Sequence, residues 1–375
     1  MSADRGASLV ERHGNQTVAD LQAYVPGPTA AEISQRYGIS PGQLIKLSSN
    51  EAPFGPSPRV REALRSIAGG DDIHRYPNSK SPRLRAAIAA QLKVQPEQIV
   101  LTAGSSDAWS PIVRAFSSPG ETVLAIDPSM LSYGEVAVLS ERRVRWLSIE
   151  FPFAIEPNTV LEAIDPSVRS VFLSSPNNTT SRLIAPQVIA DVAGSVPEVM
   201  LVVDEHYIEA ADSYREVSAV ALVSEFPNII VTRTFSKMYG LAGLRIGYAV
   251  CDVAVAGLVD TFRSKWPVSV VAEGAAVAAL EDRAHLQKNI DATTSGRAHL
   301  EKALDEIEGV KLVPAPQGGF LLFRTNKPAQ EVVEGLFRRG VMVRGDLLGG
   351  YIRVSVGTSE QNERFVTSLR GALEE

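Results

Sequence analysis

The sequence predicts an α/β protein: a large domain around a mostly parallel sheet, and a second, smaller α+β domain. Two patterns lead to this prediction. Between about residues 98 and 250, short apolar runs alternate with amphipathic segments, as strands do when helices connect them. Several runs are apolar on both faces, as expected for strands covered by helices on both sides. Beyond Trp266 the pattern changes to long helix followed by short strands.

The expected strands of the large sheet are six apolar runs, at 98–102, 122–127, 170–175, 199–205, 228–232 and 245–250. A helix is expected to begin in residues 104–116, after the first run. Ligands of parallel sheets bind at the carboxyl ends of the strands. Polar residues that directly follow these runs are therefore the candidate site residues.

The remaining segments suggest how the chain is divided. Val268–Glu308 predicts one long helix, which could link two domains. The smaller domain is expected to contain strands at 318–324, 341–344 and 351–357, with a helix over 330–339. An extended segment with a helix near Ala30–Tyr37 precedes the large domain. We expect an N-terminal segment (1–45) that packs with the small domain, a large domain (46–280) and a small C-terminal domain (281–375).

Composition excludes several classes of protein. The chain has 375 residues, 45% of them hydrophobic, and a net charge of −6, which leaves no basic footprint for nucleic acid. Cys251 is the only cysteine, so an intrachain disulfide is impossible and a cysteine-based metal site is not expected. The N-terminal residues lack an apolar signal core, and no apolar run reaches the ~18 residues that span a bilayer. We expect a cytoplasmic protein without membrane or metal partners.

Common nucleotide, zinc-protease and hydrolase motifs are absent, and the glycines of GLAGLRIG (240–247) have the wrong spacing for a dinucleotide fingerprint. What remains is a set of polar residues after strands: Ser105, Ser106, Asn178, Asp204 and Lys237, followed by Arg245. A lysine, a carboxylate and an anion-binding helix start suit pyridoxal phosphate, which needs an amine for its Schiff base and a carboxylate against its ring nitrogen. Its phosphate needs backbone N–H groups, hydroxyls and an arginine.

The chain resembles the fold-type I aminotransferases, and most closely the histidinol-phosphate aminotransferase group. The resemblance rests on four motifs taken together: GSSD, PNN, DExY and TFSKxYGLAGLRxGY. The resemblance extends over most of the chain through three further stretches: KLSSNEAPFGPSP (46–58), HRYPNSKSPRLRAAIA (74–89) and YIRVSVGT (351–358). It implies a seven-stranded type of large sheet, pyridoxal 5'-phosphate as cofactor, and amino-acid and 2-oxo-acid substrates.

The resemblance also implies roles for individual residues. Lys237 is expected to form the Schiff base and to move the proton at the substrate Cα, while Asp204 pairs with the ring nitrogen. Expected contacts to the cofactor ring and phosphate come from Tyr133 (stacking), Tyr207 and Asn178 (ring oxygen), and Ser105, Ser106, Thr234, Ser236 and Arg245 (phosphate). Tyr76 is expected to reach the neighbouring subunit's phosphate, which implies a homodimer. Arg353 is expected to bind the substrate carboxylate, with Tyr24 and Arg344 near the substrate side chain.

The chain departs from this family around the pocket. Thr179 and Ser181 replace the proline and glycine of PNNPTG, and Gly319 replaces an asparagine. Met130 occupies the first aromatic position of PxYxxY. His206 replaces a small residue in DEAYxEF; it is either a packed or solvated histidine or a tuned acid/base.

The leading hypothesis is an aminotransferase with ping-pong kinetics that acts on an amino acid or an amino-alcohol phosphate such as histidinol phosphate. The altered pocket motivates an alternative: another pyridoxal-phosphate reaction, such as decarboxylation, elimination, cyclisation or oxidation. A non-catalytic regulatory domain is a third hypothesis. It is disfavoured because Lys237 and Arg353 are both present and the first 45 residues lack the character of a DNA-binding module.

Overall fold

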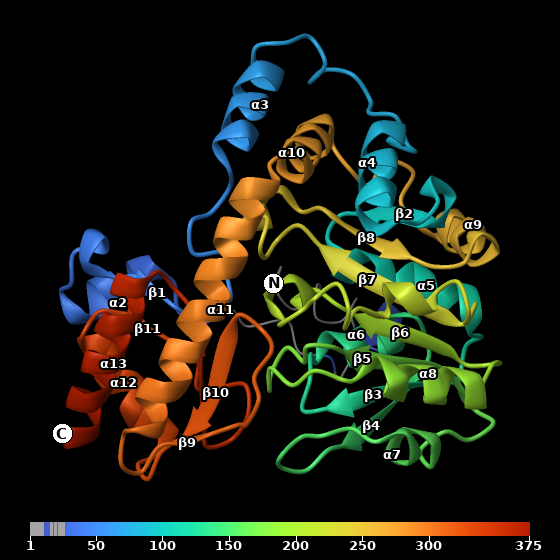
Figure 1. Ribbon diagram of the computed structural model, residues 1–375. Coiled ribbons are helices and arrows are strands. Elements are labelled where there is room, and N and C mark those ends of the chain that lie inside the picture. The colour runs from blue at the N-terminus through green and yellow to red at the C-terminus, as the bar shows by residue number, and fades with distance from the viewer. Residues whose placement is uncertain (1–10, 16–17, 19–20, 22–26) are drawn as a thin grey trace.

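The computed structural model describes residues 11–15, 18, 21 and 27–375. Within them, the strands form a seven-stranded sheet, a three-stranded sheet and a two-stranded pair. Figure 1 shows the large sheet beside the smaller unit, which carries the C-terminus.

The large sheet has the order β2-β8-β7-β6-β5-β3-β4. Its strands are β2 (Ile99–Thr102), β3 (Thr122–Asp127), β4 (Arg143–Ser148), β5 (Val168–Ser174), β6 (Met200–Asp204), β7 (Ile229–Thr234) and β8 (Gly247–Val250). Only β8 pairs antiparallel with its neighbours, so the predicted mostly parallel sheet is confirmed. The sequence prediction missed β4, an edge strand that is only partly buried and so lacks a continuous apolar run.

The central strands are covered on both faces, as their two-sided apolar pattern predicts. In β6, Leu201 and Val203 face one core while Val202 faces the other. The first core also takes residues from α3 (Pro58–Ala68), α4 (Pro82–Leu92), α7 (Pro157–Leu161), α8 (Pro186–Ser195) and α10 (Val270–Glu281). The second takes residues from α5 (Trp109–Phe116), α6 (Ser132–Leu139) and α9 (Val253–Phe262). The result is a three-layered unit.

The smaller unit has its own core. It contains the antiparallel sheet β12-β10-β9 and two helices: β9 (Lys311–Leu312), β10 (Phe320–Arg324), β12 (Tyr351–Ser355), α12 (Ala329–Arg338) and α13 (Ser359–Glu374). The N-terminal segment reaches this unit. Its strand β1 (Ile45–Lys46) pairs in parallel with β11 (Val341–Met342), and Tyr37 at the end of α2 (Ala30–Tyr37) donates a hydrogen bond to Glu334.

The single long helix predicted over Val268–Glu308 is wrong. The structure has two helices, α10 and α11 (Arg283–Asp305), which are separated at Asp282. Asp282 leaves helical geometry (φ −94°, ψ 66°), and its carboxylate caps the second helix by accepting from the His285 N–H. As Figure 1 shows, α11 then runs down to the smaller unit. Leu286 belongs to the large core and Leu300 to the small one, so α11 connects the two cores.

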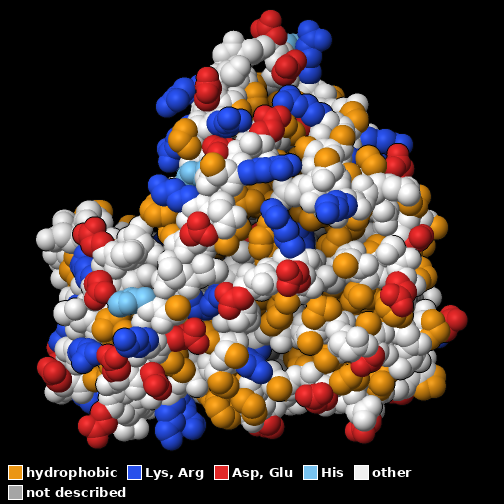
Figure 2. Space-filling view, in the orientation of Figure 1, with side chains coloured by type: hydrophobic (Ala, Val, Ile, Leu, Met, Phe, Trp, Pro, Cys, Tyr) orange, Lys and Arg blue, Asp and Glu red, His pale blue; other side chains and the backbone are white. Residues whose placement is uncertain are grey.

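The distribution of charged side chains on the described surface agrees with the small net charge of −6. On the face shown in Figure 2, acidic and basic side chains are interspersed. Among the described residues, no helix is long and apolar enough to cross a membrane, and no group of three or more His, Cys, Asp or Glu side chains could hold a metal ion.

Candidate active site

A cavity of about 300 Å³ lies at the carboxyl ends of β2, β6 and β7. This is the sheet edge where a parallel α/β fold binds its ligands. Nine of the lining residues are non-aromatic or imidazole side chains with hydroxyl, carboxylate, ammonium, guanidinium or ring N–H groups: Ser49, Glu51, Ser105, Ser106, His206, Thr234, Ser236, Lys237 and Arg245. Tyr207, Trp109, Met130 and Ala242 complete the wall. The cavity volume lies at the lower end of the range typical of small-molecule and cofactor sites, about 300–1,000 Å³.

Lys237 lines this cavity three residues after the end of β7. Its Nζ donates a hydrogen bond to the backbone carbonyl of Ser49 (3.0 Å) and lies 5.0 Å from the centre of the Tyr207 ring. The side chain is therefore held at the cavity by one hydrogen bond and one aromatic contact. Its primary amine is the nucleophile that a carbonyl ligand would require.

One end of the cavity has the groups needed to bind an anion. Arg245 Nη1 donates to the Ser236 hydroxyl (3.3 Å), and the Thr234 hydroxyl donates to the same oxygen (2.9 Å). Ser105 and Ser106 line the same cavity, at the start of a 3₁₀ turn over Ser105–Ala108 that precedes α5. Four hydroxyls, a guanidinium and a helix start suit a phosphate group.

Asp204 is fully buried next to the cavity: it is absent from the lining, but its hydrogen-bond partner His206 is part of the wall. Its Oδ2 accepts hydrogen bonds from the Tyr133 hydroxyl (2.8 Å) and from His206 Nδ1 (2.6 Å). Its Oδ1 accepts from the Thr232 hydroxyl (2.9 Å). A carboxylate has about four acceptor positions, so capacity for one further donor remains. Tyr133 is buried behind the carboxylate and is absent from the cavity lining, contrary to what a stacking position would need.

Tyr207 lies between Lys237 and the small unit. Its hydroxyl accepts a hydrogen bond from Asn50 Nδ2 (3.0 Å), and Asn50 is itself fixed by Ser355. Burial would raise the pKa of the Tyr207 phenol, but the positive charges of Lys237, His206 and Arg353 outweigh it and lower the pKa to about 7. The phenol can therefore exchange a proton near neutral pH.

Arg353, on β12, lies beside Asn178. Its Nη1 donates to the Asn178 carbonyl (2.9 Å) and its Nη2 to the Ser48 carbonyl (3.0 Å). The guanidinium also lies over the Phe320 ring, 5.2 Å from its centre. The Asn178 side chain points elsewhere, since its Oδ1 accepts from the Ser129 hydroxyl (3.0 Å). Two neutral carbonyls and one aromatic ring therefore hold this guanidinium in a fixed orientation.

Two further predicted residues, Arg344 and Tyr76, are absent from the cavity lining, and their partners are absent from it as well. Arg344 forms a two-pronged ion pair with Asp346, from Nε to Oδ1 (2.6 Å) and from Nη2 to Oδ2 (2.8 Å). Tyr76 is 81% exposed and stacks on Trp266, with ring centres 4.7 Å apart. Tyr24 lies outside the described residues.

The loop that lacks the family's proline and glycine is held by side chains. Asn177 Oδ1 accepts from the backbone N–H groups of Thr179 and Thr180, both at 2.9 Å. Ser181 has a left-handed φ of 65°, a conformation that favours the glycine it replaces. Its hydroxyl accepts from the Gly318 N–H (2.7 Å), which ties the loop to the segment before β10.

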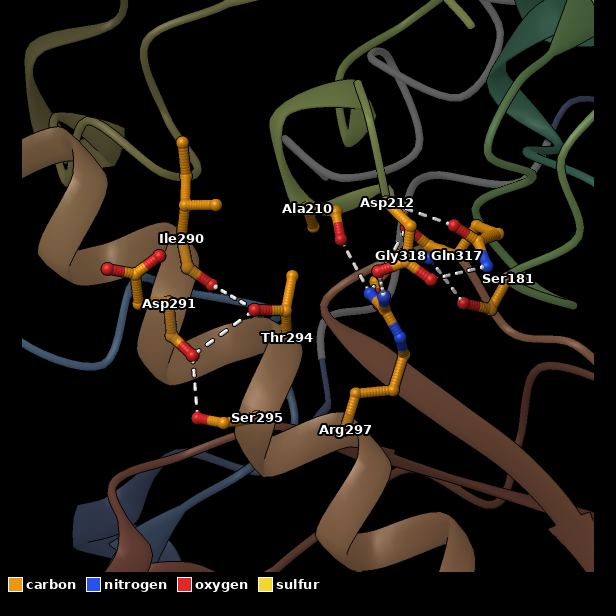
Figure 3. A network of polar contacts seen from close by, with 10 residues as sticks. All are labelled: Ser181, Ala210, Asp212, Ile290, Asp291, Thr294, Ser295, Arg297, Gln317 and Gly318. Atoms are coloured by element: carbon orange, nitrogen blue, oxygen red, sulfur yellow. Dashed lines mark hydrogen bonds and ion pairs between the residues drawn. The ribbon is translucent and has the colours of Figure 1, made fainter.

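Arg297 of α11 extends this tie (Figure 3). Its Nη1 donates to the carbonyls of Ala210 (2.5 Å) and Gly318 (3.2 Å), and its Nη2 pairs with Asp212 (2.5 Å). One buried side chain thus connects the segment after β6 with the segment before β10. Ser181 joins them through Gly318, so the loop next to Asn178 is anchored in both units.

Sequence patterns did not identify Trp109, Ser49 or Asn50 as site residues. Trp109 lines the cavity and packs edge-on against Tyr133, with ring centres 4.7 Å apart. Ser49 and Asn50 come from the SSNE stretch, whose match to the family's NENP pattern was the available signal. Their partners lie more than 150 residues away, so only folding brings them together.

The residues present fit pyridoxal phosphate. Gly104 gives direct support, because a Cβ at this position would lie 2.4 Å from Arg245 Nη2. The absence of a side chain at residue 104 leaves the room in which the guanidinium sits, beside the hydroxyls suited to a phosphate. Lys237 for the aldehyde and Asp204 for the ring nitrogen lie at the same sheet edge.

Comparison with known proteins also points to an enzyme that uses pyridoxal phosphate. Residues 42–369 match the family "Aminotransferase class I and II". Histidinol-phosphate aminotransferase 2 of Methylococcus capsulatus is 38% identical over 95% of this chain and 97% of its own length. Histidinol-phosphate aminotransferase of Akkermansia muciniphila is 35% identical over 97% and 99%.

A solved structure shares the fold. The histidinol-phosphate aminotransferase of Sinorhizobium meliloti, in complex with pyridoxal-5'-phosphate, aligns with a TM-score of 0.85 at 23% identity, over 96% of this chain and 97% of that one. Likeness at this identity shows the fold, whereas the family match and the two relatives concern the sequence itself. The chain therefore belongs to the class I and II aminotransferases, enzymes that use pyridoxal phosphate as their cofactor.

Proposed function

We propose that this enzyme moves an amino group between an α-amino acid, or an amino-alcohol phosphate such as histidinol phosphate, and a 2-oxo acid, with Lys237 as the catalytic residue. One observation carries the proposal: Lys237 lines the same cavity as the anion-binding group around Arg245 and Ser236. The bound cofactor supplies an aldehyde carbon and an electron-accepting ring. A lysine beside both can bind the aldehyde and then carry the proton at the substrate Cα.

The other residues divide the work of binding. Asp204 is proposed to hold the proton on the ring nitrogen, which it can do because it retains acceptor capacity in a buried site. Arg245, with Ser105, Ser106, Thr234 and Ser236, is proposed to hold the phosphate. Tyr207, with its pKa near 7, is proposed to hydrogen-bond the ring oxygen, as is Asn178.

Substrate recognition is proposed to rest on Arg353. Arg353 is 7% exposed as a residue, and two backbone carbonyls fix its guanidinium, so an incoming carboxylate or phosphate would meet a preorganised donor. Arg344 is a different case, because Asp346 already neutralises its charge. Tyr24 remains a sequence-based proposal for the substrate side chain.

Two further proposals concern the whole molecule. A homodimer in which Tyr76 reaches the neighbouring active site is supported by its high exposure and by its stacking on Trp266, itself 48% exposed. A cytoplasmic location is proposed from the composition.

The test is a half-reaction. Purified holoenzyme is mixed with single amino donors, among them histidinol phosphate, glutamate and aromatic amino acids, without an acceptor. We expect one donor to convert the bound cofactor to its amine form within one turnover, and a 2-oxo acid to reverse the change. Failure of every donor would overturn the aminotransferase proposal. In Lys237→Ala, borohydride should no longer link the cofactor to the chain; a persisting link would show that another amine binds it.

A further inference from the structure

His206 is a buried imidazole next to the carboxylate of the site. It follows β6 by two residues, is 4% exposed and contributes to the cavity wall. Its Nδ1 lies 2.6 Å from Asp204 Oδ2, and since a carboxylate only accepts, Nδ1 carries the proton. Its Nε2 is buried and makes no hydrogen bond within the described part of the chain.

The charges around His206 favour its protonated form. Burial lowers the pKa of the imidazole, but the Asp204 carboxylate and Tyr207 outweigh burial and the repulsion from Lys237, so the pKa lies above its ordinary value. Tyr207 is the closest ring, with centres 4.1 Å apart. Glu209, buried nearby after the same strand, also interacts electrostatically with His206.

Among the three donors to Asp204, His206 alone can carry a positive charge. Tyr133 and Thr232 donate neutral hydroxyl groups to the same carboxylate. Each hydrogen bond lowers the affinity of the carboxylate for a proton, and a charged donor adds an electrostatic attraction that the neutral hydroxyls lack. Of the three donors, His206 is therefore the one whose charge can alter the basicity of Asp204.

We propose that His206 is a positioning residue of the cofactor site: through Nδ1–H it holds the Asp204 carboxylate and sets how strongly that carboxylate retains a proton on the cofactor's ring nitrogen. This proposal rests on the proposed pairing of Asp204 with that nitrogen. It assigns a function to a position where the family pattern has a small residue, and it resolves the open interpretation of His206 in favour of a tuning group.

The first experiment is a pH titration of the absorption of the bound cofactor in His206→Ala and His206→Asn. Loss of a nearby positive charge favours protonation at the lysine–cofactor link, so we expect the midpoint to rise by about one pH unit in both variants. The Asn amide can donate to Asp204 in place of Nδ1–H. His206→Asn should therefore recover most of the cofactor affinity that His206→Ala loses.

A matched control is His285→Ala. His285 is also partly enclosed and hydrogen-bonded, through Nε2 to the Gly55 carbonyl (3.0 Å), but it is not part of the cavity wall. Its loss should leave the midpoint unchanged. A midpoint in His206→Ala within 0.2 units of wild type, roughly a fifth of the 1.4 kcal/mol that one unit represents, would overturn the proposal.

A second measurement does not depend on turnover. In holoenzyme labelled with ¹⁵N-histidine, the spectrum should contain a downfield Nδ1–H signal that disappears in His206→Ala. A signal from Nε2–H alone would overturn the proposal even if the titration shifts. The proposed function and the proposed role of His206 fail in different ways. Wild-type protein without a borohydride-reducible cofactor link contradicts the role of Lys237. A normal link with unaltered titration in His206→Ala contradicts only the role of His206.

Discussion

Gly104→Ala tests the proposed phosphate end of the site. Gly104 has a φ of 96°, and its Cβ would lie 2.4 Å from Nη2 and 3.2 Å from Cζ of Arg245. The guanidinium is the far end of a flexible side chain, so it would move aside rather than unfold the protein. The backbone strain, about 1–3 kcal/mol, is present with and without cofactor and so does not change the affinity.

The affinity changes because the displaced arginine loses its contact with the phosphate. One hydrogen bond to a charged group contributes about 1.5–3 kcal/mol, so the dissociation constant of pyridoxal phosphate should rise about 10- to 150-fold. The assay is a titration of the cofactor-free protein, followed by the fluorescence of Trp109, which lines the cavity. Gly243→Ala is the matched control, since a Cβ at Gly243 has no atom within 4 Å. Equal dissociation constants for the two variants would refute the reasoning.

Three further predictions follow from the geometry. Arg353→Lys cannot reproduce both carbonyl contacts and a two-pronged grip on the substrate, so kcat/KM in the half-reaction should fall about 10- to 150-fold; an unchanged value would place the carboxylate elsewhere. Asp346→Asn removes the charge that neutralises Arg344, so KM for histidinol phosphate should fall several-fold relative to glutamate, and an equal change for both donors would contradict this. Burial raises the pKa of Glu209 to about 7 despite the opposing Arg233, so its contribution to stability is full below about pH 4.5 and is lost as the pH rises through 7. Glu209→Gln should therefore gain in Tm relative to wild type between pH 5 and pH 8, whereas a constant difference in Tm would count against this prediction.

Much of the fold could be predicted because its signals are local. Buried strands are apolar at successive positions, and the runs before Asp204 and Lys237 predicted both the strands and the sheet edge where these side chains lie. Edge strand β4 and the break at Asp282 were missed for different reasons. The strand has a weak pattern because one side is uncovered, whereas the break had a local signal, an aspartate able to cap the following helix, that the long apolar pattern obscured.

The sequence by itself determined the class of chemistry: an amine, a carboxylate and an anion-binding turn, each next to a strand. The tertiary structure decided which groups modify one another. Asp204 accepts from Tyr133 of α6, Thr232 of β7 and His206, and Tyr207 accepts from Asn50, 157 positions away. No spacing rule predicts such contacts, because they depend on how the layers pack. Hydrogen bonds and charge interactions act over a few ångströms of space, whatever the separation along the chain.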